Sequence, residues 1–501
     1  MSDRHKAERQ AVQPDSKIFT PADQARFARI SADFNPIHLD PVVARRTQMG
    51  APIVHGIHGA LWALEALCGS EAISPLGLGG NFLEPIYVGE PATVTLVRRA
   101  EGEARLNIVA GGTVATSITV RLGPKGAPVS TPSAEGALPS VWPRIPIELN
   151  LEQMQGRAGS IALPRPPDDL ATLFPNLCRA LSPRRVAGMI SLSPLVGMVS
   201  PGLHSLLKSF ALDFVEGSDA LRYTTVDVNK RFRLVRMAVV GPGIAGECLA
   251  YARVPPVRQP AIAEIATAMA QDAFEDARVL VVGGSRGLGE VVAKACAAGG
   301  ADVLITYAIG KGDGERVVEE IAAFGGRAAA RLFDINGDIP AQLSDLALAP
   351  THVYYFPSCP TLKRHGPLFS ADLSAQYERF YVHGFLATVQ ALLAQTGGGG
   401  LRVFYPSTLV IDQPTRGSAE FAMAKAAGEA LCRQMNQYLP GADVVCQRLP
   451  RLLTDQTATV SPAEASPVLD IMLPIVREMQ AKRVPSHAHP APPTLRAGLA
   501  G

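Results

Sequence analysis

The sequence predicts two kinds of unit in one chain, an α+β part with antiparallel strands followed by an α/β part with a parallel sheet. A long apolar helix at 57–68 precedes segments in which apolar and polar residues alternate, the pattern of half-buried antiparallel strands. From residue 278 the pattern changes to a short apolar strand, a glycine-rich turn and a helix, after which strands and helices alternate. A chain of 501 residues has room for several domains of roughly 150 residues each.

Composition favours large buried cores and excludes several classes of protein. Apolar residues make up 47% of the chain and charged residues 18%, far from a disordered composition. The net charge of +2 comes from interspersed acids and bases, so we expect no nucleic-acid partner and no membrane partner. The seven cysteines are scattered without a CxxC pair, which favours reduced thiols, a cytoplasmic location and no structural metal site. We find no signal-like or membrane-spanning apolar run.

The first elements can be predicted from their capping residues. Residues 1–17 are polar, and we expect them to be disordered. Residues 19–30 are predicted to form a short helix, with Thr20 as its N-cap and Pro21 at its first position. The catalytic candidates follow directly after this helix.

The loop after this helix holds the side chains with the clearest chemistry. Asp33, Asn35 and His38 lie within six residues, and Pro36 stiffens the chain between the acid and the base. Gly56 then opens the long apolar helix, so a carboxylate, an imidazole and a helix amino end occur in one stretch. Together they suit the addition or removal of water beside a carbonyl group. Each residue alone could instead be an N-cap aspartate or a hydrogen-bonded loop histidine.

The whole string resembles the signature of the MaoC-like (R)-specific enoyl-thioester hydratases and dehydratases. That signature has an aromatic residue, then Ser, Gly, Asp, any residue, Asn, Pro, an aliphatic residue and His. Here Phe27 is followed by SADFNPIH at 31–38, with Ala32 in place of the glycine. A motif of this length seldom recurs by chance.

The resemblance implies a reaction and a role for each residue. The substrate would be a trans-2-enoyl or (R)-3-hydroxyacyl thioester of coenzyme A or of acyl carrier protein, and the reaction needs no cofactor. Asp33 and His38 would be the acid/base pair, with His38 touching the water. Asn35 would orient the pair or the water, and the amide of Gly56 would stabilise the thioester oxygen.

Strand patterns extend this first unit to residue 126. Residues 92–97 and 117–122 alternate as strands, and 76–80 reads as a turn-rich stretch between the long helix and those strands. One long helix followed by a bent antiparallel sheet is the hotdog arrangement, expected over 18–126. Residues 127–145 are rich in Pro and Ser and are predicted to be a linker.

A weak internal repeat predicts a second, degenerate hotdog over 146–255. Residues 201–207 (PGLHSLL) mirror 55–61 (HGIHGAL) and are therefore expected to open an apolar helix, while 232–241 echo 82–89. The second copy lacks the Asp-x-Asn-Pro-x-His string, so we expect it to line an acyl tunnel. His204 is either a substrate contact or a structural histidine.

The third unit, over 256–483, begins with a nucleotide-binding pattern. Residues 278–282 (RVLVV) form a buried strand, GGSRGLG at 283–289 a tight turn, and 290–298 a helix whose amino end can hold a pyrophosphate. The pattern is similar to the short-chain dehydrogenase/reductase family over about 276–480. The predicted fold is thus an α+β double hotdog followed by an α/β Rossmann-type doubly wound parallel sheet. The resemblance implies cofactor contacts from Gly283, Ser285, Arg286, Gly287, Leu288, Gly289, Asp334 and Ile335.

The charge pattern predicts which dinucleotide binds. An NAD site offers an acid at the end of the second strand for the ribose 2′-hydroxyl, whereas this chain has Tyr307 and Ala308 there. Arg286 lies inside the glycine loop, where it could pair with a 2′-phosphate. We therefore expect NADP(H).

The catalytic residues of the dehydrogenase family are only partly present. Ser407 follows the strand at 401–406 and Lys425 stands at the family's lysine, but Phe421 replaces the tyrosine. Loss of a positioned proton donor typically costs about 10²–10⁴-fold in rate, so we expect no efficient ketoreductase. The residues that could restore the proton path are Ser407, Thr408, Tyr405 and Tyr381.

Three functions stay open at this point. The first is a hydratase/dehydratase with a dinucleotide-binding domain of reduced activity. The second is a bifunctional 3-ketoacyl reductase and dehydratase of fatty-acid or polyketide type, and the third is a non-enzymatic scaffold that binds an acyl carrier protein. We expect a homo-oligomer, since both families usually associate. The Pro/Ala-rich tail at 484–501 is predicted to be disordered.

Overall fold

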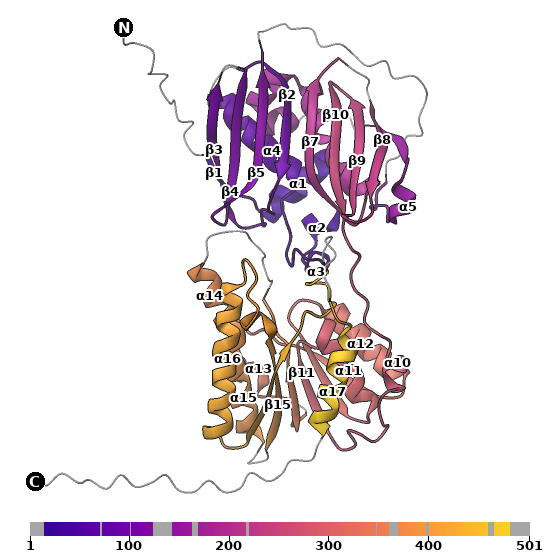
Figure 1. Ribbon diagram of the computed structural model, residues 1–501, viewed down its shortest axis with the longest axis vertical. Coiled ribbons are helices and arrows are strands. Elements are labelled where there is room, and N and C mark those ends of the chain that lie inside the picture. Colours follow the sequence, from indigo (N-terminus) through magenta and orange to yellow (C-terminus); the bar gives the residue numbers. More distant parts are fainter. Residues whose placement is uncertain are drawn as a thin grey trace, which may run out of the picture.

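The computed structural model describes two bodies joined end to end (Figure 1). The described residues are 15–70, 73–100, 102–123, 143–162, 169–216, 220–346, 348–359, 369–396, 400–458 and 465–480. Residues 1–14, the predicted tail at 484–501 and most of the predicted linker lie outside them. The α+β and α/β parts occur in the predicted order.

The first body is built on one antiparallel sheet, compatible with a hotdog arrangement. Within the described residues its strand order is β1-β3-β4-β5-β2-β7-β10-β9-β8-β6. The strands are β1 (Asp15–Ile18), β2 (Pro75–Phe82), β3 (Pro91–Ala100), β4 (Glu103–Ala110), β5 (Thr113–Leu122), β6 (Ala158–Ala162), β7 (Ser205–Phe214), β8 (Ala220–Asn229), β9 (Leu234–Gly241) and β10 (Ile244–Ala252). Antiparallel pairing of β2 with β7 joins the two halves into one sheet.

Helices pack on one face of this sheet and enclose its core (Figure 1). They are α1 (Pro21–Ser31), α2 (Pro36–Leu39), α3 (Pro41–Arg45), α4 (Gly56–Ser70), α5 (Leu151–Met154), α6 (Asp169–Leu173), α7 (Pro175–Leu181), α8 (Pro183–Ile190), α9 (Leu192–Pro194) and the π-helical turn η1 (Leu195–Val199). The predicted start of α1 is confirmed, because Thr20 and Asp23 form a capping box in front of it. The predicted apolar helix is α4, which is buried along most of its length.

Two predictions about single segments of this body are wrong. Residues 15–17 belong to β1, which pairs with β3, and are not disordered. The stretch 76–80 is part of β2 and not a turn. Its glycines are explained by packing, because a Cβ on Gly80 would overlap the ring of Phe210 in β7.

The repeat was also read in the wrong register. Residues 201–207 do not open a helix, because β7 begins at Ser205 and the helices of the second half come earlier, between α6 and η1. Residues 232–241 contain β9, whereas 82–89 follow the end of β2, so the two segments do not correspond. A short apolar run cannot be assigned to helix or strand by periodicity alone. The similarity of 201–207 to 55–61 was therefore not enough to predict a helix there.

The second body is a doubly wound parallel sheet in the order β13-β12-β11-β14-β15-β16. Its strands are β11 (Arg278–Val282), β12 (Asp302–Tyr307), β13 (Arg327–Leu332), β14 (His352–Tyr355), β15 (Leu401–Thr408) and β16 (Ala442–Leu449). Its helices are α10 (Ile262–Ala266), α11 (Gly287–Ala298), α12 (Lys311–Ala323), α13 (Ile339–Leu343), α14 (Ala371–Glu378), η2 (Arg379–His383), α15 (Gly384–Gln395), η3 (Leu409–Ile411), α16 (Ala419–Tyr438) and α17 (Val468–Gln480). Separate cores fill its two faces, one under α11, α12 and α17 and the other under α13, α15 and α16.

The two bodies meet where α2 and α3 lie over the carboxyl ends of the parallel strands (Figure 1). Arg45 and Arg46, at the end of α3, form ion pairs with Asp313 in α12. The loop that carries Asp33 and His38 therefore lies close to the predicted dinucleotide site. Among the helices of the described segments, none combines the length and the hydropathy needed to cross a membrane.

Candidate active site and dinucleotide site

The turn between α1 and α2 brings the predicted acid and base together. Ala32 ends α1 in the left-handed conformation, with φ 58° and ψ 27°, which accounts for the glycine of the MaoC-like signature at this position. Asn35 caps α2, and Pro36 starts it. Side-chain ligand atoms of Asp33, His38 and His55 all lie within 4.8 Å of one another.

Asp33 is held by both halves of the first body. Its Oδ1 accepts the backbone N–H of Asn35 at 3.1 Å, and its Oδ2 accepts the hydroxyl of Ser193 in α9 at 2.6 Å. A Cβ on Gly197 in η1 would overlap this carboxylate, so only a glycine allows η1 to pack so closely. The sequence analysis missed Ser193 and Gly197, since no motif surrounds them.

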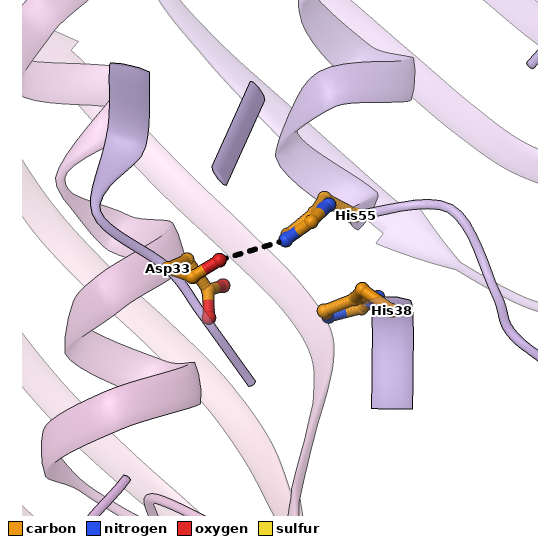
Figure 2. A group of neighbouring side chains, drawn as sticks. All are labelled: Asp33, His38 and His55. Atoms are coloured by element: carbon orange, nitrogen blue, oxygen red, sulfur yellow. Dashed lines mark hydrogen bonds between the residues drawn. The ribbon is translucent and has the colours of Figure 1, made fainter. Parts of the chain in front are cut away.

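His38 is oriented by its own backbone neighbourhood and by a second histidine. Its Nδ1 donates to the carbonyl oxygen of Ile53 at 2.8 Å, which leaves Nε2 as the basic nitrogen. The rings of His38 and His55 stack with centroids 3.8 Å apart, and Figure 2 shows them side by side and facing Asp33.

His55 serves as a support for the pair. Its Nδ1 lies 2.8 Å from Oε1 of Gln24, and its Nε2 lies 3.1 Å from the carbonyl oxygen of Asp33 (Figure 2). Burial lowers the pKa of His55 well below its ordinary value, so the ring is neutral and donates to one of these two oxygens. The sequence shows His55 directly before Gly56 at the start of α4. Its contact with Gln24 of α1 is visible only in the structure.

Burial sets the protonation of the acid and the base. Asp33 is 2% exposed, and removal from water raises the pKa of its carboxyl group from 3.8 to about 6, against the opposing effect of the Ser193 and Asn35 hydrogen bonds. Burial likewise lowers the pKa of His38 from 6.5 to about 4. A neutral imidazole therefore faces a carboxyl group that titrates near neutral pH, a suitable pair for proton transfer.

Asn35 and Gly56 have clear structural roles in addition to the predicted chemical ones. The amide of Asn35 donates to the carbonyl oxygen of Gly197 at 2.8 Å and also contacts those of Gly202 and Leu203, so it ties the loop to the second half. Gly56 is the first residue of α4, where backbone amides have no acceptor within the helix. A Cβ at this position would come 2.9 Å from the ring of Phe82.

The same three side chains offer a poor metal site. Both ring nitrogens of His55 face protein oxygens, and Nδ1 of His38 donates to Ile53. One carboxylate and one imidazole nitrogen are left, fewer than the three protein ligands of a typical catalytic zinc.

A cavity of about 1990 Å³ lies between the two bodies. Its lining on the side of the first body includes Asn35, Ile37 and His204, and on the side of the second body the glycine loop and Lys425. Asp33 and His38 are not among the described residues that line it, whereas Asn35, Pro36 and Ile37 between them are. His204, whose Nε2 lies 3.0 Å from Glu148, faces the cavity and does not belong to the acid/base pair.

All eight residues predicted to contact a dinucleotide line this cavity. Gly283 and Gly287 have positive φ values of 79° and 58°, and a Cβ on Gly289 would overlap the carbonyl oxygen of Gly283. The loop is thus shaped by glycines in front of the amino end of α11, as a dinucleotide site requires. Asp334 closes the turn after β13, where its Oδ1 accepts the backbone N–H of Asn336 at 2.9 Å.

Arg286 lines the cavity, but its guanidinium already has partners in the protein. Its Nη1 lies 3.1 Å from the carboxylate of Asp455, and its Nη2 donates to the carbonyl oxygen of Arg45 at 3.4 Å. The guanidinium therefore bridges the two bodies and is not free beside the end of β12. Charge alone suggested a free guanidinium, whereas Asp455 lies far away in sequence.

The residues at the reductase position form a tight cluster. Lys425 Nζ donates to the carbonyl oxygen of Pro406 at 2.7 Å and lies 3.9 Å from the centre of the Tyr381 ring. Burial lowers the pKa of Lys425 to about 7. Phe421 packs edge-to-face on Tyr381 and has no hydroxyl to offer.

Two of the four possible replacement donors are already engaged. The hydroxyl of Tyr405 donates to the carbonyl oxygen of Tyr381 at 2.9 Å, and that of Ser407 donates to Glu429. Thr408 caps η3 by accepting the backbone N–H of Val410. Tyr381, Ser407 and Thr408 all line the cavity, and Tyr381 is the one whose ring lies against Nζ of Lys425.

Comparisons with known proteins agree with both halves of this description. A MaoC-like domain model matches residues 4–117, and a short chain dehydrogenase model matches residues 277–354. The (R)-specific enoyl-CoA hydratase of Aeromonas caviae is 42% identical over 84 residues, 16% of this chain and 60% of that protein. An uncharacterised oxidoreductase of Methylorubrum extorquens is 31% identical over 160 residues, 30% of this chain and 62% of that protein. The chain thus spans less than two thirds of the length of these relatives.

A short chain dehydrogenase from Burkholderia cenocepacia, solved in complex with NADP, has 24% sequence identity and a TM-score of 0.36 over 41% of this chain and 91% of that chain. Asp33 and His38 fall inside the first matched segment, and the glycine-rich loop falls inside the second. The chain therefore joins a MaoC-like domain at its amino-terminal end to a short-chain dehydrogenase domain at its carboxyl-terminal end.

Proposed function

We propose that the MaoC-like domain reversibly hydrates trans-2-enoyl thioesters to (R)-3-hydroxyacyl thioesters, carried by coenzyme A or acyl carrier protein. The observation that carries this proposal is the convergence of Asp33 and His38, with their pKa values moved to about 6 and about 4. The identity with the Aeromonas caviae hydratase supports the same reaction.

Hydration requires a protonated carboxyl group on Asp33 and a neutral imidazole on His38. Burial favours this arrangement, because it raises the pKa of Asp33 and lowers that of His38. The lone pair on Nε2 of His38 takes a proton from water as the water oxygen bonds to C3 of the enoyl group. The π electrons move to C2, where the protonated carboxyl group of Asp33 delivers a proton, so the pair ends as imidazolium and carboxylate. Because the pKa of Asp33 is the higher of the two, a single proton on the pair lies on Asp33, as hydration requires, and this form is the main one only below about pH 6.

One further group completes the proposed site. The amide of Gly56, at the amino end of α4, would stabilise the negative charge that develops on the thioester oxygen. Asp33 is 2% exposed, so an acyl thioester reaches it only when side chains between the pair and the cavity move. We further propose that the two halves of the sheet are two hotdog units, of which the second holds Asp33 through Ser193.

The dehydrogenase domain is proposed to bind NADP(H) with the eight cavity-lining residues of the glycine loop and the β13 turn. The glycine loop fits a pyrophosphate, because its four glycines keep side chains out of the space before α11. A bound NADPH would supply a hydride. Lys425 and Tyr381 would hold a carbonyl substrate nearby, but Phe421 provides no proton donor at the family's position.

A second candidate function is reduction of 3-ketoacyl thioesters in the same chain. One observation favours it, namely that Tyr381 and Lys425 line the same cavity as Asn35 and Ile37 of the hydratase loop. Oxidation of NADPH by a 3-ketoacyl thioester would support it if the rate falls in both Tyr381→Phe and Lys425→Ala. Binding of acyl carrier protein without any turnover would instead favour the scaffold.

The hydratase proposal is tested by loss of enoyl absorbance with crotonyl-CoA. Asp33→Asn and His38→Ala are each expected to lower the rate by at least about 10²-fold. The matched controls are Asp272→Asn and His383→Ala, because both residues are exposed and lie in the other domain. Wild-type rates in both test variants would rule the proposed mechanism out.

A further inference from the structure

We propose that Arg45 and Arg46 of the MaoC-like domain bind the 2′-phosphate of NADP(H) held in the dehydrogenase domain. The dinucleotide site would then be completed across the interface between the two bodies. This inference rests on the proposed binding of a dinucleotide to the glycine loop.

The dehydrogenase domain leaves the 2′ position without a charged partner from its own second strand. The ribose of a dinucleotide in this fold is read at the carboxyl end of the second strand, by an acid for NAD or an arginine for NADP. Here β12 ends at Tyr307, and the following residues Ala308 and Ile309 line the cavity. Arg286 does not fill the gap, because it pairs with Asp455.

The arginines of the MaoC-like domain reach this position. The guanidinium of Arg45 packs directly over Gly310, three residues after the end of β12, where a Cβ would overlap its Nη2 atom. Arg45 and Arg46 both line the cavity together with Tyr307 and Ala308. Both come from the end of α3, which the sequence assigns only to the hotdog unit.

The local charge favours an anion. Arg45 and Arg46 share a single carboxylate, that of Asp313, at 2.6 Å and 2.5 Å, so two positive charges face one negative charge. Nε of Arg45 is a buried donor for which the described segments supply no hydrogen-bond acceptor. Buried donors of this kind call for a partner that the protein alone does not supply, and a phosphate accepts several such bonds at once.

The position of α3 gives this contact a consequence for the hydratase. Asp40 caps α3 and lies two residues after His38, so the arginines and the catalytic histidine belong to one short segment. A dinucleotide that binds Arg45 and Arg46 would hold this segment in place. Linkage then requires that an acyl thioester bound at the hydratase site and NADP(H) change each other's affinity by the same factor.

The simpler explanation is that the two arginines only fasten the domains together through Asp313. The two explanations differ in their effect on cofactor choice. If the arginines only connect the domains, they affect stability and contribute equally to the binding of NADPH and NADH. If they bind the 2′-phosphate, they change the ratio of the two affinities. An arginine substitution lowers that ratio, and removal of Asp313, the competing anion, raises it.

The experiment measures dissociation constants of NADPH and NADH for the full chain by isothermal titration calorimetry. Arg45→Ala and Arg46→Ala are each expected to weaken NADPH binding roughly 10- to 100-fold and to leave NADH binding unchanged. Unchanged NADH binding also shows that the variants fold. Asp313→Ala is expected to raise the NADPH preference. Arg105→Ala is the charge-matched control, since Arg105 is exposed on β4, away from the cavity.

The outcomes separate this inference from the proposal beneath it. Equal losses of NADPH and NADH binding, or no loss, in both arginine variants would overturn the 2′-phosphate assignment and leave dinucleotide binding standing. A wild-type chain that binds neither cofactor would overturn dinucleotide binding itself, and this inference with it. If the alanine variants fail to fold, Arg45→Gln and Arg46→Gln replace them, because glutamine keeps hydrogen-bonding groups without the charge. The ratio of NADPH to NADH affinity is then measured for these variants and tested in the same way.

Discussion

Replacement of Asp33 by asparagine is expected to stabilise the MaoC-like domain while it abolishes hydration. Burial raises the pKa of Asp33 from 3.8 to about 6. At about 1.4 kcal/mol per pKa unit, the ionised carboxylate costs about 3 kcal/mol of folding free energy once the pH exceeds 7. Asparagine has the same shape and no charge. Its Oδ1 can accept the backbone N–H of Asn35, and its amide can donate to Ser193.

The sign of the pH dependence follows from the raised pKa. Well below pH 3.8 the carboxyl group is protonated in both the folded and the unfolded chain, so it carries no penalty. Between pH 3.8 and about 6 the unfolded chain releases the proton while the folded chain still holds it, so the wild type loses stability over this range and the penalty levels off above the folded pKa. The advantage of Asp33→Asn therefore grows with pH, from about 1 kcal/mol near pH 4.5 to at most about 3 kcal/mol at pH 8.

Urea unfolding at several pH values, followed with the full chain, measures this difference for the first body. Crotonyl-CoA hydration is measured on the same samples and is expected to fall by about 10²–10⁴-fold. Asp272→Asn, at an exposed position, should change neither quantity. A variant that is less stable than the wild type at pH 8, or a gain that is the same at every pH, would refute the argument that burial controls this carboxyl group.

Three other substitutions test separate parts of the structure. Gly197→Ala places a Cβ on the carboxylate of Asp33, so hydration of crotonyl-CoA should fall at least about 10²-fold while NADPH affinity by calorimetry stays unchanged; loss of both would mean general misfolding. Phe421→Tyr restores the Tyr-x-x-x-Lys spacing to Lys425, and NADPH oxidation by a 3-ketoacyl thioester should rise at least about tenfold; no gain would show that the module lacks more than a hydroxyl. Ala32→Gly relieves a left-handed residue and should raise the free energy of unfolding by about 1 kcal/mol in urea titration; a destabilised variant would contradict that reading of the turn.

Local elements could be predicted because their causes lie within a few residues. Thr20 and Pro21 determine where α1 begins, and the predicted strand at 278–282 is β11. The spacing from Asp33 to His38 was enough to predict that a carboxyl group and an imidazole lie close together, since Asn35 and Pro36 shape the turn between them. The glycine loop before α11 was recognised for the same reason.

Long-range packing explains the predictions that failed. The stretch at 76–80 has the composition of a turn, yet it forms the central strand β2, because its glycines make room for the ring of Phe210. The second half could not be aligned on the first by eye, since an apolar run of seven residues fits both a strand and a helix. Arg286 lines the cavity, but its ion pair with Asp455 from a distant loop could not be read from the local sequence.

The sequence alone determined which chemical groups this protein carries and in what local order, because short motifs encode turns, caps and loop shapes. Only the tertiary structure decided how those groups are tuned and combined. Ser193 meets Asp33 across 160 positions, and Asp313 meets Arg45 across 268. A pKa depends on every atom that replaces water around a group, and those atoms are brought together only when the two halves and the two bodies pack.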